Sequence, residues 1–571
     1  MQSRTRIGLV GSAIALLLVA CAPQRADVAS PAGQDSASPL PFKRITAIIR
    51  GAPASLVQER TQRSGGIRGL DGIQELTHAG FTYLKADGTR AAQLAEAVPT
   101  IENGLWKVYP DGRMETTWVI KSGARWHDGM PVTADDFLFI SAVERDRELD
   151  IPPYAEHELI DGMTAVDSRT ITVTWKRPYI EADGLFSYRA AGLPIPKHVL
   201  EPAFNDDKGG FLGHPYWTEE FIGAGAFKVH EWVRDNHTTL RRFDDYVLGR
   251  PHLDEIEVRF IPDNNTILAN MLAGADLTLG KTISLDIALA ARDQWQDGRV
   301  AVLPQNWTPL NPQFINPDPP IVADLRFRRA MLQALDRQQL ADFIFSGYGS
   351  VAHSYVDPAT PLYHLVEPSI VRYEFDSRAA AQAIEGLGYA KQPDGFFYDS
   401  AGQRLSVSIY AGAQNDIHPK AVAAVAAMWQ PFGVAVEQVL IPIQRAGDRE
   451  YRANFPSFEI AERRNSLIVA EIWRFHSSTV SLPENRYTGP GNTRYRHPEH
   501  DAWLERYVMA IPMQERMQAL AGLVRHQTEN LVQLPLFYGA DPTLISNRLI
   551  NVTARGDSFT QAWNIQVWDV R

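Results

Sequence analysis

Residues that could carry enzyme chemistry are present in this chain, but their spacing matches no catalytic motif. Residues 497–500 (HPEH) place two histidines and a glutamate together, yet Pro498 stands between them. Proline disfavours a regular helix, so this segment predicts a surface loop or the start of a helix, and we expect no metal site. The chain also lacks a phosphate-binding loop ending in Lys-Ser or Lys-Thr, a G-x-S-x-G elbow and an H-E-x-x-H zinc motif. These absences favour a protein that is not an enzyme and needs no cofactor.

The single cysteine, Cys21, lies where a different chemistry is expected. Two arginines precede an apolar stretch, residues 7–20, which has the length of a secretory signal and is short for a membrane span. The stretch ends in Leu-Val-Ala-Cys, which resembles the bacterial lipobox, in which the cysteine becomes the lipidated first residue. An ordinary signal peptide with an incidental cysteine is the alternative. We therefore expect a lipoprotein signal peptide at 1–20, lipidation at Cys21 and a flexible tether at 21–40.

Length and charge limit the class of protein further. The chain has 571 residues with 56 basic and 67 acidic side chains, which gives a formal charge of -11. At about 150 residues per domain, this length predicts two or more lobes. The acidic balance argues against a nucleic-acid partner, which would require a basic face. A lone cysteine excludes an internal disulfide framework, a cysteine zinc site and an iron–sulfur cluster.

The elements that would hold functional residues change in type along the chain. Asp-Gly pairs between short β-like runs predict antiparallel strands over 80–130, packed by tryptophans. Residues 320–440 alternate between helix and strand, which is typical of a βαβ lobe. Within that lobe, Asp324 is expected to cap a helix that ends near Gly347, and a further helix is expected over 419–430.

Several blocks, in order along the chain, are similar to a known family. In residues 126–137 (WHDGMPVTADDF) an Asp-Gly turn is followed by Thr133, which is expected to cap a helix. This block is therefore predicted to be structural rather than a ligand site. The other blocks are residues 223–229, 250–254, 261–263, 273–276, 324–337 and 563–569. Together they resemble the family-5 extracytoplasmic solute-binding proteins, which serve peptide and nickel ABC importers.

The resemblance implies an α/β fold: a two-lobed periplasmic-binding-protein clamshell of type II with an extra β-rich subdomain in lobe I. Lobe I would comprise residues 41–305 together with 533–571, and lobe II residues 306–532. The chain would cross between the lobes near 303–311 and near 531–536. A ligand closes such a clamshell only through contacts that the open state lacks. Residues between the lobes are therefore expected to carry the function.

The resemblance also implies what the protein does. We expect a lipoprotein, anchored to a membrane on the periplasmic side of the cell envelope, that captures a solute and delivers it to an ABC transporter permease. The solute would be a peptide or a related amide-bearing compound, and the protein a monomer that binds no nucleic acid. Three alternatives stay open: a metal chelate or metallophore as ligand, a periplasmic chaperone or sensor without transport, and an unrecognised hydrolase.

The candidate ligand residues begin with an arginine pair. The family often binds a peptide amino terminus through an aspartate of lobe II, but the corresponding stretch, 458–466, has no aspartate. It carries Arg463 and Arg464, followed by Asn465. Paired guanidiniums suit a carboxylate or another anionic group. Alternatively, one arginine is solvated and the other fastens the loop.

Four more residues are predicted near the ligand. Trp307, on the first crossing, suits either stacking on a planar ligand or packing at the hinge. Trp473, just after the arginine loop, faces the same choice, with core packing favoured. Asn485 and Arg486 belong to a stretch that resembles the loop by which lobe II approaches the cleft.

Overall fold

The structure is a computed structural model of the chain. It describes residues 41–57, 67–85, 88–149, 151, 154, 156–188, 192–464, 467–491, 493–554 and 561–571. The predicted signal peptide, Cys21 and the tether lie outside the described residues, and so does Asn465. The chain divides into two compact units, Met1–Pro41 and Phe42–Arg571, and only the second is described below.

A large mixed sheet is the frame of the described residues. Its strands are β1 (Arg44–Ile49), β8 (Phe227–Val233), β9 (His237–Arg242), β10 (Glu255–Phe260), β11 (Leu277–Thr278), β12 (Gly298–Pro312), β13 (Ser350–Val351), β16 (Ser406–Gly412), β17 (Ala435–Ile441), β18 (Phe458–Ile460) and β19 (Leu534–Ser546). They run in the order β17-β16-β18-β12-β19-β11-β1-β10-β9-β8, with β13 paired to β19. Strands from both halves of the chain thus share one hydrogen-bonded sheet.

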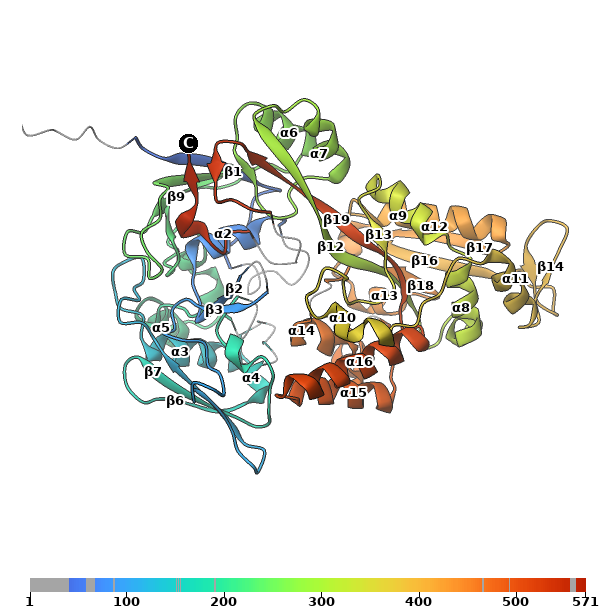
Figure 1. The fold of residues 1–571 in the computed structure, drawn as a ribbon, viewed down its shortest axis with the longest axis horizontal. Helices are drawn as coiled ribbons and strands as arrows, with labels where there is room; N and C mark the ends of the chain where they lie inside the picture. Colours follow the sequence, from blue (N-terminus) through green and yellow to red (C-terminus); the bar gives the residue numbers. More distant parts are fainter. Residues whose placement is uncertain are drawn as a thin grey trace, which may run out of the picture. The chain divides into compact units, whose positions relative to one another are not determined.

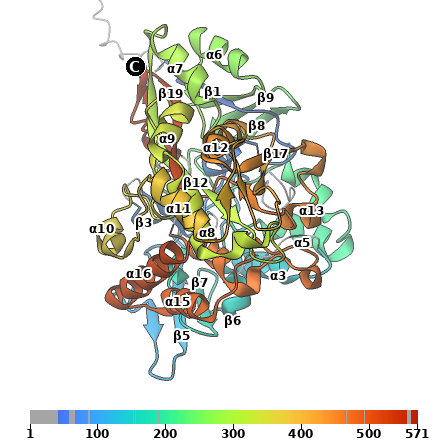
Figure 2. The ribbon, with the colours of Figure 1, turned by 90° about the vertical axis from the view of Figure 1, so that its right-hand side faces the viewer.

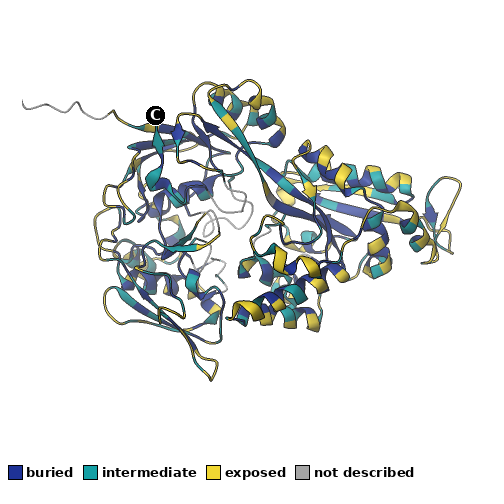
Figure 3. Cartoon of the chain, in the orientation of Figure 1, coloured by how far each residue is buried: buried dark blue, intermediate teal, exposed yellow. Residues whose placement is uncertain are grey.

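Two long strands, β12 and β19, connect the halves of this sheet. They pair antiparallel from Gly298 opposite Ser546 to Leu310 opposite Leu534, with an irregularity beside Trp307. Figure 1 shows the pair running from the strands around β1 to those around β16, and Figure 3 shows it largely buried. The two predicted crossings fall on or next to this pair, so residues near them are held by paired strands whose register shifts on either side of residues 307–308.

The N-terminal half also holds a smaller antiparallel sheet. Its strands are β4 (Trp106–Val108), β5 (Met114–Val119), β6 (Ile160–Ala165) and β7 (Thr170–Trp175), in the order β4-β5-β7-β6. The short strands β2 (Thr82–Leu84) and β3 (Arg90–Ala92) pair beside it. Phe81 stacks against Trp118 and Phe137, with ring centroids 4.5 and 4.0 Å away. The antiparallel structure predicted for 80–130 is confirmed, and its aromatic side chains supply the core.

The block at 126–137 is structural, as predicted. Thr133 and Asp136 form a reciprocal capping box at the start of α3 (Ala134–Arg145). Asp136 is buried and also accepts a hydrogen bond from the indole N–H of Trp126 at 3.3 Å and from the backbone N–H of Lys197 at 2.9 Å. One carboxylate therefore joins a turn, a helix start and a distant loop.

The C-terminal half contains the predicted βαβ unit, because β16 and β17 are parallel and α12 (His418–Phe432) connects them. One helix prediction there is wrong. The segment expected to form a single helix from Asp324 to Gly347 contains two, α8 (Leu325–Gln333) and α9 (Arg337–Phe345). Asp336 accepts a hydrogen bond from the backbone N–H of Gln339 at 3.0 Å, so a second N-cap interrupts the helical periodicity.

The remaining helices of eight or more residues are α2 (Leu70–Thr77), α5 (Lys197–Asp206), α6 (Asn264–Leu272), α7 (Leu285–Arg292), α11 (Ser377–Glu385), α15 (Pro498–Met509) and α16 (Met513–Glu529), and among the shorter ones is α14 (Val469–Ile472). Figures 1 and 2 show α15 and α16 side by side. Leu504 and Leu520, from these two helices, belong to the same buried apolar cluster as Ile45 and Trp118 of the N-terminal half. Within the described ranges no helix is long and apolar enough to span a bilayer.

Candidate functional site

The arginine loop lies against the first crossing strand. β18 pairs with β12, with Ile460 opposite Leu310, and just beyond it Arg463 exchanges two backbone hydrogen bonds of 2.8 Å with Trp307. Trp307 is 3% exposed, and its ring centroid lies 6.4 Å from that of Tyr355. The indole therefore packs at the crossing, which is what the hinge-packing alternative expects.

Arginines gather around this loop with few carboxylates to neutralise them. Glu471 lies 3.0 Å from Nη1 of Arg474 and 3.7 Å from Nη1 of Arg464. Among the described residues, the carboxylate oxygen nearest to Arg463 is on Glu459, at 3.9 Å from Nη2. Burial lowers the pKa of Arg463 to about 10, and the nearby Arg474 adds to this effect. The guanidinium nevertheless remains protonated at neutral pH, so the loop keeps a positive charge.

A small cavity of about 10 Å³, roughly the space of one water molecule, lies beside this cluster. It is lined by Asn311, Arg463, Arg474, Phe475, Pro490, Gly491, Thr493 and Gln533. Two of these residues carry a buried donor without a hydrogen-bond partner among the described residues: Nε of Arg474 and Nδ2 of Asn311. Asn311 is fully buried, and Gln533 donates to its Oδ1 at 2.6 Å, which fixes the orientation of the amide. Because an unpaired buried donor costs about 1–3 kcal/mol, this cavity favours an occupant that offers acceptor oxygens.

The residue before Arg463 has the opposite character. Glu462 forms an ion pair of 2.9 Å with Lys281, which also meets Asp541 at 2.9 Å. The same carboxylate accepts hydrogen bonds from the side chains of Asn306 and Asn415. Burial alone would raise the pKa of Glu462, but Lys281 and these hydrogen bonds outweigh it and hold the pKa well below its usual range. This charge has partners within the protein: Lys281, which it shares with Asp541, and the two asparagine amides.

Further polar contacts join the N-terminal half of the chain to the second half. Asp416 lies 3.2 Å from guanidinium nitrogens of both Arg50 and Arg68. At another point the backbone N–H of Val469 donates to Oε1 of Glu181 at 2.9 Å. Burial raises the pKa of Glu181 to about 7, although the charge of a neighbouring arginine opposes this shift. These contacts come from residues outside the strands of the large sheet, so they are separate from its shared ladder of backbone hydrogen bonds.

The other residues predicted near the ligand occupy different surroundings. The ring of Trp473 stacks on His476 with centroids 4.3 Å apart. Asn485 uses its amide within its own loop, because Nδ2 donates to the Val480 carbonyl at 2.7 Å and Oδ1 accepts from the Leu482 N–H at 3.0 Å. Arg486, the next residue, has a positive φ of 52°. The loop approaches the cavity, but through Pro490 and Gly491.

Residues that could hold a metal ion lie elsewhere. Within the described part of the chain, His497, Glu499 and His526 each offer a ligand atom, and these atoms lie within 4.8 Å of one another. None of them lines the cavity beside Arg463. His497 begins α15, as the sequence predicts, but its expected companion His500 is directed elsewhere, with Nε2 placed 3.1 Å from the amide of Gln527.

Comparison with known proteins identifies the family. Residues 96–459, more than half of the chain, match the bacterial extracellular solute-binding proteins, family 5, middle region. The chain belongs to this family. It is 24% identical over 339 residues to the oligopeptide-binding protein AppA of Bacillus subtilis, a match that covers 58% of this chain and 59% of AppA. A probable ABC transporter-binding protein of Deinococcus radiodurans is 25% identical over 333 residues, covering 52% and 54%. The chain thus spans somewhat over half the length of these curated relatives.

Solved structures show the same fold over nearly the whole chain. The oligopeptide-binding protein of Thermus thermophilus, complexed with a pentapeptide, superposes with a TM-score of 0.72 at 21% identity, covering 92% of this chain and 96% of that one. NikA of Brucella suis, in complex with Fe(III)-EDTA, gives 0.75 at 17% identity and covers 92% and 100%. The α/β, two-lobed fold of periplasmic binding proteins, expected from the sequence, is therefore confirmed.

Sequence reasoning identified the arginine loop but missed its partners. Arg474 lies next to Trp473, but residues 458–474 hold three arginines and three glutamates, so no excess of charge marked it. Asn311 and Lys281 carry no such signal, since each is a single polar residue in a distant segment. Their places at the cavity and at Glu462 depend on the pairing of strands far apart in sequence.

Proposed function

We propose that this protein captures a solute between its two lobes and delivers it to an ABC transporter permease. Membership of family 5 and similarity to the oligopeptide-binding protein AppA support this proposal. We further propose a peptide as the solute, because curated relatives are described as peptide-binding proteins. Whole-chain charge is acidic, but the ligand would meet the local positive charge around Arg463.

The observation that carries the ligand chemistry is the pair of unpartnered donors at the cavity. Arg474 Nε and Asn311 Nδ2 are buried without acceptors among the described residues, and the Arg463 guanidinium borders the same space. A carboxylate or a peptide carbonyl would satisfy these donors, and a charged acceptor would form the stronger hydrogen bonds. An amino terminus would find Glu462 already compensated by Lys281. We therefore infer that the cavity receives an anionic or carbonyl-bearing end of the ligand.

A ligand in this position would favour closure through the rest of its length. Shifting a two-state equilibrium from 1:99 to 99:1 requires about 5.5 kcal/mol of differential binding. Asn311, Arg463 and Arg474 all fall in the expected lobe II, so they would hold the ligand in the open state as well, and the differential energy would come from contacts of the same ligand with lobe I. The contacts from Arg50 and Arg68 to Asp416 would then add to closure without the ligand.

The proposal extends to location. A signal peptide at 1–20 and lipidation at Cys21 would hold the protein on a membrane at the periplasmic side of the envelope, within reach of its permease. The sequence alone supports this step. Mass spectrometry of the membrane fraction would detect the lipidated N-terminal peptide, whereas a mature chain that begins at another residue and carries no lipid would contradict it.

A metal chelate is the second candidate ligand. It is favoured by the same cationic cavity, since chelators such as EDTA are polycarboxylates, and NikA of Brucella suis was solved with Fe(III)-EDTA. Such a ligand would again present acceptor oxygens to Arg463 and Arg474.

Native mass spectrometry of protein purified without added ligand tests both candidates. Peptides released on denaturation support the peptide proposal, and a metal-containing chelate supports the second. Calorimetric titration then compares a bound peptide with the same peptide carrying a C-terminal amide. Equal affinity for the two forms would contradict recognition of a carboxylate, and failure to bind any peptide or chelate from defined libraries would contradict the proposed function itself.

A further inference from the structure

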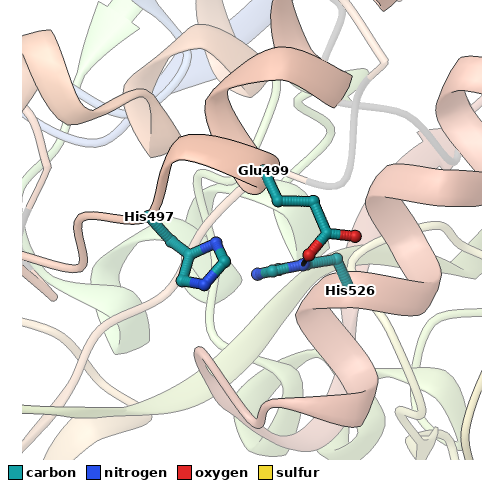
Figure 4. A group of neighbouring side chains, drawn as sticks. All are labelled: His497, Glu499 and His526. Atoms are coloured by element: carbon teal, nitrogen blue, oxygen red, sulfur yellow. Dashed lines mark ion pairs between the residues drawn. The ribbon is translucent and has the colours of Figure 1, made fainter.

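Two helices of the C-terminal half place three metal-binding side chains together. His497 and Glu499 come from the start of α15, and His526 from the last turns of α16. Figure 4 shows the three side chains turned toward one another. Each offers one ligand atom, and these atoms lie within 4.8 Å of one another.

The atomic contacts favour a ligand role for these side chains over a purely structural one. Oε2 of Glu499 lies 3.7 Å from Nδ1 of His526, too far for a hydrogen bond. Nδ1 of His497 is buried and has no hydrogen-bond partner among the described residues. The His497 and His526 rings lie 4.8 Å apart between centroids. The polar atoms thus converge without satisfying one another, as expected where a bound ion completes the site.

The surroundings of His526 resemble those of a metal ligand. Its Nε2 is 3.0 Å from the hydroxyl of Tyr495, which orients the ring and leaves Nδ1 toward Glu499. Such a second partner for the far nitrogen is a regular feature of ligating histidines. The side chain is 6% exposed.

We propose that His497, Glu499 and His526 bind one divalent transition-metal ion of the Zn²⁺ class. Two histidines and one carboxylate form a ligand set that such ions accept, with water in the remaining position. Ligands of a tetrahedral zinc ion lie about 3.4 Å apart, so modest rotations complete the geometry. The exposed Glu499 can move most easily. The ion would fasten the start of α15 to the end of α16.

This proposal does not rest on the proposed function. The three residues lie outside the lining of the solute cavity, so zinc binding and solute binding can each fail while the other stands.

Zinc titration of the full chain, prepared without a histidine tag and stripped with chelator, tests the proposal. We expect one Zn²⁺ per chain in competition with a chromophoric chelator, and a higher melting temperature with zinc than with Mg²⁺. Glu499→Gln keeps the size of an exposed side chain, and His497→Asn keeps a good N-cap residue, so both variants should fold. Each should weaken zinc binding at least tenfold and remove the zinc-dependent rise in melting temperature.

Matched controls define the outcome that would overturn the proposal. Glu515→Gln lies on α16 and His230→Asn on β8, and both side chains are exposed away from the group. They should bind zinc as the unaltered chain does. If Glu499→Gln and His497→Asn also bind zinc with unaltered affinity, or if the unaltered chain binds no zinc at 100-fold molar excess, the proposal is wrong. In chelator, all four variants should melt within a few degrees of the unaltered chain.

Discussion

Glu462 and Arg463 are neighbours in sequence, yet their charged groups are in opposite situations. Glu462 meets Lys281 at 2.9 Å and accepts hydrogen bonds from two asparagines. Arg463 has no carboxylate oxygen closer than 3.9 Å among those described, and it borders a cavity with two further unpartnered donors. One residue is part of the protein's own electrostatic balance, and the other leaves charge available to a ligand.

The difference teaches where function is to be sought in this molecule. A compensated buried charge stabilises the fold and offers little to a solute, because its partners already supply its hydrogen bonds. Uncompensated donors cost stability in the empty protein and release that cost when an acceptor arrives. The predictions below test this contrast, beginning with the largest expected effect.

Removing Lys281, the cation that pairs with Glu462, should cause the largest loss of unfolding free energy. Lys281→Met leaves Glu462 and Asp541 without their shared partner. The three side chains are about a quarter exposed, so we expect a loss of about 3 kcal/mol in unfolding free energy, at the lower end for a broken buried pair. Urea unfolding measures it. Lys420→Met is the control, since Lys420 is 45% exposed and 3.6 Å from Asp286; similar losses in both variants would contradict the contrast.

Removing a donor from the cavity should change affinity more than stability. Arg474→Met removes a cavity donor and should weaken the binding of an anionic solute by about 2 kcal/mol, or roughly 30-fold. Arg464→Met is the matched comparison, because both arginines pair with Glu471 but only Arg474 lines the cavity; it should change affinity less than about threefold. Calorimetric titration with an identified ligand decides, and equal losses would show that the cavity donors have no special role.

Glu181 is another carboxylate, half-buried, and its raised pKa predicts that the stability of the protein depends on pH. Its pKa is raised to about 7 by burial, so the folded state binds a proton that the unfolded state releases above about pH 4.5. Stability from this group is therefore full below pH 4.5 and is lost as the pH rises to about 7. Because Glu181 is only half-buried, we expect about 1 kcal/mol. Glu181→Gln should gain stability over the unaltered chain at pH 8 but not at pH 5, measured by thermal unfolding; a pH-independent difference would contradict this account.

The smallest effect is expected at Asn485. Its amide already holds its own loop through contacts to Val480 and Leu482. Asn485→Ala should therefore lower the unfolding free energy by about 0.5 kcal/mol and leave solute affinity nearly unchanged. A tenfold loss of affinity with unaltered stability would instead assign Asn485 the ligand contact that its position in the loop first indicated.

Local structure was predictable where neighbouring residues determine it. The capping box of Thr133 and Asp136 and the N-cap at Asp324 were readable because their hydrogen bonds join residues two or three positions apart. The split between α8 and α9 was missed because the apolar periodicity continues across Asp336, and only its cap shows the break. The order of similar blocks was enough to identify the family and its fold.

The candidate site was only partly predictable. The sequence singled out the loop of Arg463 and Arg464, since two adjacent guanidiniums in a stretch without aspartate are visible without any structure. It could not distinguish them: Arg463 lines the cavity, whereas Arg464 turns to Glu471. That distinction depends on side-chain direction, which the pairing of Arg463 with Trp307 fixes.

The sequence by itself determined many of the elements and caps, the family, and the adjacent arginines of one loop. Only the tertiary structure decided which charges are compensated. Lys281 and Glu462 are 181 positions apart, and Asn311 and Gln533 are 222 apart. The pairing of β12 with β19 brings these segments together. The electrostatic energy of a buried charge depends on its distance from a partner of opposite charge, and here that distance is set by the pairing of distant strands.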